Sequence, residues 1–140
     1  MTNQPPAISH HAALIYTMVM AAAVDRDMKD IELGQIGRLV KSLPAFHGYD
    51  VGQLTDTAKE CAVILSTNDG LHRILAMIAE ALPHQLRETA YLLACEIAAI
   101  DRRVSFEEIQ LLRMIRKALH VDPLAAAAVE RATVARLAAI

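Results

Sequence analysis

The sequence contains one short pattern twice, and this repeat constrains the fold more than any other feature. The segment Ala22 to Arg26 (AAVDR) matches Ala98 to Arg102 (AAIDR), and at the same offset of 76 residues Glu32 falls on Glu108. Each copy reads as an apolar helix, an Asp-Arg turn and an amphipathic helix. Chance similarity between helices rich in Ala and Leu is the alternative, but the acidic residues in register favour a helical hairpin that is used twice.

Composition supports an all-α fold. Hydrophobic residues make up 54% of the chain and aromatic residues only 4%, with five Gly and five Pro. Such a chain is too apolar to be disordered and has few of the residues that strands prefer. We therefore expect a single domain over residues 1–140. It should be a compact bundle of about seven helices, with pseudo-twofold repeat halves at about 8–43 and 84–119.

Periodicity and capping residues set the expected helix limits. Ser105 and Glu108 have the spacing of a capping box, and Pro83 suits the first turn of a helix. The inner face of the sixth helix is predicted to hold Phe106, Ile109, Leu112, Ile115 and Leu119. The expected helices cover about 7–24, 30–43, 51–65, 70–82, 83–100, 105–119 and 123–140.

The first apolar run is predicted to be a core helix. Residues 12–24 are apolar apart from Thr17, and residues 1–11 contain no Lys or Arg, which a secretory signal would need. The run is also shorter than the roughly 20 residues that span a bilayer.

Cys61 and Cys95 lie in apolar helical stretches without a Cys-x-x-Cys spacing. We therefore expect two reduced, buried thiols in a cytoplasmic protein, with a redox or metal-thiolate pair as the alternative.

Carboxylates gather at the two repeated turns. The first turn carries Asp25, Asp27, Asp30 and Glu32, and the second keeps Asp101 and Glu108. One interpretation is structural: the Asp side chains accept backbone N–H bonds in the turns and the Glu side chains favour helix N-termini. The other is a site for Ca²⁺, Mg²⁺ or Zn²⁺, although the match to an EF-hand loop is poor. The candidate metal ligands are Asp25, Asp27, Glu32, Asp101 and Glu108.

The last helix suggests an interaction surface. Residues 124–137 are apolar on more than one face, which suits close helix packing, a protein partner or a homodimer. Residues 1–100 carry 11 acids and 7 bases and residues 101–140 carry 5 acids and 7 bases, a balance that argues against nucleic-acid binding. A basic rim is available from Arg113, Arg116, Lys117, Arg131 and Arg136.

The second repeat copy resembles the signature of TerB-like domains. That signature is an Ala-rich helix, an Asp, a small polar cap, a Glu and a helix that stops at Leu-Gly-hydrophobic. The resemblance covers about residues 8–130. It departs from the family at Arg26, Arg102 and His120, which stand where the family often has Gly. The residues that carry the resemblance are Ala98 to Glu108, Leu111-Leu112 and Leu119-His120-Val121.

The resemblance implies a bacterial, cytoplasmic, all-helical protein associated with tellurite resistance and stress responses. It further implies a scaffold or sensor that works with membrane-associated protein partners. Our first hypothesis is a TerB-like, non-enzymatic module whose acidic turns bind a divalent cation or a basic partner surface. The alternative is a metal-free interaction module that uses the apolar last helix and the basic rim. The third is an enzyme that reduces tellurite through Cys61 and Cys95, which the lack of paired catalytic groups disfavours.

Overall fold

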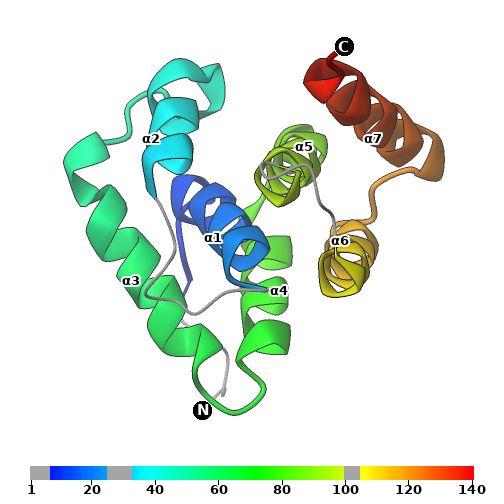
Figure 1. The fold of residues 1–140 in the computed structure, drawn as a ribbon. Helices are drawn as coiled ribbons and strands as arrows, with labels where there is room; N and C mark the ends of the chain where they lie inside the picture. Colours follow the sequence, from blue (N-terminus) through cyan, green and yellow to red (C-terminus); the bar gives the residue numbers. More distant parts are fainter. Residues whose placement is uncertain (1–6, 25–32, 100–104) are drawn as a thin grey trace.

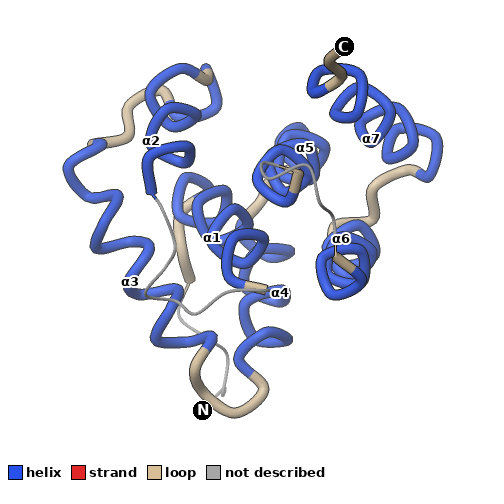
Figure 2. The backbone as a smooth tube through the Cα atoms, viewed as in Figure 1, coloured by secondary structure: helices blue, strands red, loops and turns tan. Residues whose placement is uncertain are grey.

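The computed structural model of the chain describes residues 7–24, 33–99 and 105–140. This part of the chain consists of α-helices, short 3₁₀ turns and loops, so the predicted all-α bundle of about seven helices is confirmed (Figures 1 and 2). The α-helices are α1 (His10–Ala23), α2 (Leu33–Ser42), α3 (Leu54–Leu65), α4 (Gly70–Ala81), α5 (Arg87–Ala98), α6 (Phe106–Ala118) and α7 (Pro123–Leu137). The 3₁₀ turns are Pro44–Phe46, Val51–Gln53 and His84–Leu86.

The predicted core helix is α1, which lies at the centre of the bundle (Figure 1). Every residue from Ala13 to Ala21 is buried, so the helix is enclosed on all sides, as a helix without a polar face must be. Its one polar side chain in that run, Thr17, donates its hydroxyl to the carbonyl of Ala13 at 2.8 Å. None of the described helices is long and apolar enough to cross a bilayer.

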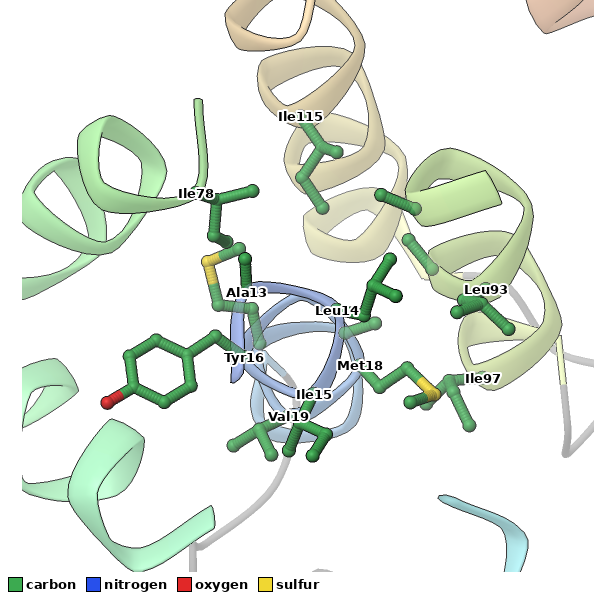
Figure 3. Close-up of a cluster of buried hydrophobic side chains, with 14 of the residues drawn as sticks. Ala13, Leu14, Ile15, Tyr16, Met18, Val19, Ile78, Leu93, Ile97 and Ile115 are labelled. Carbon is green, nitrogen blue, oxygen red and sulfur yellow. The ribbon is translucent and has the colours of Figure 1, made fainter. Parts of the chain in front are cut away.

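The other helices pack around α1. Helices α3, α4 and α5 contact it along its length, and α6 touches it more briefly. Figure 3 shows α1 side chains spreading toward Ile78 of α4, Ile97 of α5 and Ile115 of α6. Helix α7 is different, because its main packing partner is α5 on the far side from α1 (Figure 1). The outer end of the bundle is therefore built from α5, α6 and α7.

Two helix limits differ from the sequence prediction because of proline. Pro83 does not open α5; it precedes the 3₁₀ turn His84–Leu86, and α5 begins at Arg87. Helix α2 ends at Ser42, because Leu43 precedes Pro44 and takes an extended conformation with ψ 136°. Both prolines thus shorten a helix.

The two repeated turns lie outside the described residues, since residues 25–32 and 100–104 are not among them. The hairpins that would contain them are α1 with α2 and α5 with α6. The pseudo-twofold repeat therefore stays a prediction from the sequence.

Candidate functional site

Of the predicted metal ligands, the structure describes only Glu108. Asp25, Asp27, Glu32 and Asp101 lie outside the described residues. Glu108 is buried and closes the predicted capping box: its carboxylate accepts the backbone N–H of Ser105 at 3.2 Å, and the hydroxyl of Ser105 accepts the backbone N–H of Glu108 at 3.0 Å. Within residues 7–24, 33–99 and 105–140, no three His, Cys, Asp or Glu side chains gather in a way that would hold a metal.

Both cysteines are free and buried. Burial raises the pKa of the Cys61 thiol to about 12. Burial also raises the pKa of Cys95 to about 12, although its side-chain interaction with Tyr91 lowers the pKa. Because the thiolate is the nucleophile, thiols that stay protonated at neutral pH are weakly reactive. The environment of the cysteines favours the structural interpretation over the redox one.

A groove lies between α6 and α7, with α5 as its floor. Helices α6 and α7 each pack on α5, and neither packs closely on the other. The resulting cavity has a volume of about 350 Å³. Its apolar lining comes from Cys95, Ala98, Ala99, Ile109, Leu112 and Val134, and its polar lining from Tyr91, Arg113, Arg116, Glu130 and Thr133.

Helix α7 leaves the groove open because it packs on α5 through a narrow stripe. Its buried residues, Ala126 and Thr133, are small and permit close approach of the two helices. Asp122 caps the N-terminus of α7 by accepting the backbone N–H groups of Leu124 and Ala125 at 3.1 Å. At the other end, the guanidinium of Arg136 donates two hydrogen bonds, at 2.8 and 2.7 Å, to the carboxylate of Glu96 on α5. Both ends of α7 are thus fixed while its remaining faces stay exposed.

The prediction of which α6 side chains face the core is partly wrong, and one of the misplaced residues, Ile109, lines this groove. Leu111, Ile115 and Leu119 are buried, but Phe106 is 69% exposed and Ile109 is 40% exposed. Helix α6 is rotated so that Glu108 and Leu111 face inward, which places Ile109 at the groove. Two apolar side chains predicted to be core therefore lie at the surface.

Helix α6 ends in a Schellman motif at His120, where the resemblance implied a glycine. The N–H of Val121 donates to the carbonyl of Arg116 at 3.0 Å, and the N–H of His120 donates to the carbonyl of Lys117 at 3.2 Å. His120 adopts a left-handed conformation with φ 53° to make this turn. The turn geometry is kept without the glycine, and it positions the connection from α6 to α7.

A polar network crosses the groove floor. The hydroxyl of Tyr91 on α5 donates to Glu130 Oε2 on α7 at 2.5 Å, and Arg116 Nη1 on α6 lies 3.8 Å from the same oxygen. Burial, and next the hydrogen bond to Glu130, raise the pKa of Tyr91, so its hydroxyl remains a donor. The carboxylate of Glu130 is therefore held by two groups.

The five residues of the predicted basic rim have different surroundings. Arg113 and Arg116 line the groove, and Arg131 belongs to the outer face of α7 together with Leu124 and Val134. Arg136 is bound to Glu96, as described above, and Lys117 is exposed on α6. No carboxylate in the described part of the chain forms an ion pair with Arg113. The groove consequently has a positive edge.

Sequence reasoning missed Tyr91 and Glu130. They are 39 residues apart and meet only because α7 returns to α5. A signal for the groove existed in the apolar residues of α6 and α7, which are more numerous than one packing face requires.

One comparison with known proteins gives a match. The family model of the tellurite resistance protein TerB matches residues 11–131. No curated protein and no solved structure matches the chain.

Proposed function

Because this chain belongs to the TerB family of tellurite resistance proteins, we propose that it is a non-enzymatic module of a tellurite- and stress-resistance system in the cytoplasm, and that it docks a protein partner in the groove between α6 and α7. Membrane-associated resistance proteins are the partners we consider first. The observation that carries the proposal is the groove itself, an apolar floor on α5 between two helices that do not close over it.

The distribution of exposed apolar side chains supports docking at this end of the bundle. Ile109 on α6 and Val134 on α7 are exposed and line the groove, and Phe106 on α6 and Leu124 on α7 are exposed outside it. Scattered single apolar residues are ordinary on a protein surface, but neighbouring ones beside a cavity are typical of interaction sites. Covering these side chains would remove apolar area from water and stabilise a complex.

We expect a groove variant to lose tellurite resistance. Replacing Ile109 and Val134 by aspartate should reduce survival of tellurite-treated cells that depend on this protein, because two charges would have to be buried under any docked partner. Both positions are exposed, so the fold should tolerate the change. The measurement is the tellurite concentration that halves growth, and we expect it to fall close to the value for cells without the protein.

Val63→Asp is the matched control for this prediction. Val63 is 65% exposed on α3 and does not line the groove. Cells with this variant should survive as wild type. Equal resistance in wild-type and groove-variant cells, at equal protein levels, would contradict the docking proposal.

The acidic turns support a second proposal, a divalent-cation site. Glu108 already serves the capping box of α6, so the candidate ligands concentrate in the first turn, at Asp25, Asp27 and Glu32, with Asp101 as the remaining acid of the second. Clustered carboxylates are the ligand type that Ca²⁺ and Mg²⁺ prefer, and carboxylates also bind Zn²⁺. This proposal rests on the sequence of the turn.

Calorimetric titration with Ca²⁺, Mg²⁺ and Zn²⁺ tests the cation proposal. We expect one of the ions to bind wild type and to raise its thermal midpoint, because an ion that binds only the folded state stabilises it. Asp25→Asn combined with Glu32→Gln should abolish both effects by removing two charged ligands. Absence of heat and of stabilisation with all three ions would eliminate the site.

A further inference from the structure

We propose that the occupant of the groove is a single amphipathic helix of a partner protein, with an apolar stripe flanked by acidic side chains. This inference rests on the proposed docking function and specifies its partner. The groove would seat the helix between α6 and α7, where it would complete the layer that these two helices form on α5.

The dimensions of the groove suit two turns of helix. Its α6 wall runs from Ile109 to Arg116, which at 1.5 Å per residue is about 10 Å. A helix that binds in a groove uses apolar anchors at positions i, i+3, i+4 and i+7, which span that length. A volume of about 350 Å³ accommodates a few such side chains.

The lining also selects a helix over an extended peptide. Apart from Ala99, which follows α5 directly, all the groove residues belong to α5, α6 or α7, and away from the C-terminal end of α5 their backbone groups are used within the helices. An extended peptide along the groove would therefore find few backbone partners for its own N–H and C=O groups. A helix satisfies its backbone internally and can present an apolar face.

The charges at the groove select acidic flanks. Arg113 and Arg116 lie at the end of the α6 wall opposite Ile109, so the wall changes from apolar to basic along its length. Glu130 is the carboxylate that lines the groove, and it is held by Tyr91 and faces Arg116. A partner carboxylate near Arg113 would therefore meet a cation that has no ion pair within the described residues.

Two other occupants fit less well. A hydrocarbon chain would fill the cavity but carries no charge that could meet Arg113 at its edge. A second copy of this chain offers an acidic exposed helix face at Asp56, Glu60 and Val63 on α3, but this face carries only one large apolar side chain. One valine is too little to fill the groove.

Three synthetic helical peptides test the inference by fluorescence anisotropy. They share one length and one stripe of leucines, and their flanking positions are all glutamate, all glutamine or all lysine. We expect the glutamate peptide to bind wild type about twofold to fivefold more tightly than the glutamine peptide, the size expected for one partly exposed ion pair at Arg113. Arg113→Glu with Arg116→Glu should reverse the order so that the lysine peptide binds best, and Ile109→Asp with Val134→Asp should abolish binding of all three.

The outcomes separate this inference from the docking function on which it rests. Equal affinity for the three peptides would overturn the proposal that the partner helix has acidic flanks, but the groove would remain a docking site for a helix. If no peptide binds but cells with the groove variant are still sensitive to tellurite, the proposal that the occupant is a helix is overturned and the docking function is retained. A wild-type dimer in sedimentation that Val134→Asp dissociates would make a second copy the occupant and also overturn the inference. If the peptides still bind the variant with Ile109→Asp and Val134→Asp, their binding site lies outside the groove. That result would contradict both the helical occupant and docking in the groove.

Discussion

Gly70→Ala is expected to lower the free energy of unfolding by about 3 kcal/mol or more, among the largest effects of a single methyl group. Gly70 is the buried first residue of α4 and follows the tight turn after α3. A Cβ at this position would collide with the carbonyl oxygen of Ile64 and lie 2.8 Å from that of Leu65. Both are backbone atoms that end α3, so neither can move aside without distorting the α3–α4 junction beneath α1.

Gly37→Ala is the matched control for this substitution. A Cβ on Gly37, in the middle of α2, would meet only Leu54 Cδ2 at 3.7 Å, an ordinary contact. Since alanine is favoured over glycine inside a helix, the free energy of unfolding of this variant should be higher than that of wild type by about 0.5 to 1 kcal/mol. Urea denaturation of the two variants measures the difference. A Gly70→Ala protein as stable as wild type would show that the α3–α4 turn is looser than described.

Arg87→Met is expected to lower the free energy of unfolding by about 2 to 3 kcal/mol, because the guanidinium of Arg87 donates hydrogen bonds to three carbonyl groups. Arg87 Nη2 donates to the carbonyl of Ala79 at 3.0 Å, Nη1 to that of Leu119 at 3.1 Å, and Nε to that of Leu82 at 3.4 Å. These carbonyls belong to the C-terminal ends of α4 and α6, where a cation is also favoured by the helix dipole. One side chain of α5 thus joins two helix ends.

The substitution by methionine keeps much of the apolar stem of Arg87 and removes the donors. The midpoint of thermal denaturation should be lower by about 8 °C in Arg87→Met than in wild type. The midpoint of Arg87→Lys should lie between those two values, because lysine retains the charge without the planar set of donors. Arg73→Met serves as control, since Arg73 is exposed and, among the described residues, donates only to the hydroxyl of Thr67 at 3.0 Å. We expect its free energy of unfolding to change by no more than about 0.5 kcal/mol. A loss of stability in Arg87→Met no larger than in Arg73→Met would show that the three hydrogen bonds of Arg87 do not join α4 and α6 as described.

Much of the fold was predictable from the sequence, because local rules decide helix ends. Ser105 with Glu108 forms the expected capping box, and Asp122, an Asp directly before a proline, caps α7. Asp50 also acts as an N-cap, but of the 3₁₀ turn that precedes α3. The start of α5 was misplaced because a proline is equally acceptable in the first turn of a helix and just before one.

The candidate site was less predictable because it depends on how helices rotate against each other. Periodicity placed Phe106 and Ile109 on the inner face of α6 together with Ile115, whereas the structure buries Leu111 with Ile115. Glu108 is buried as well, although a sequence rule would place a charged residue outside. The contact of Tyr91 with Glu130 needs the return of α7 to α5, which no local pattern encodes.

Docking in the groove between α6 and α7 can be tested in living cells by photo-crosslinking. A photoreactive phenylalanine analogue replaces Val134 in one variant and Val63 in another, two exposed valines of similar accessibility, 69% and 65%. We expect a discrete protein adduct from position 134 that Ile109→Asp removes, and no such adduct from position 63. Cells that resist tellurite yet form no adduct at 134, or form the same adducts at both positions, would contradict docking in the groove.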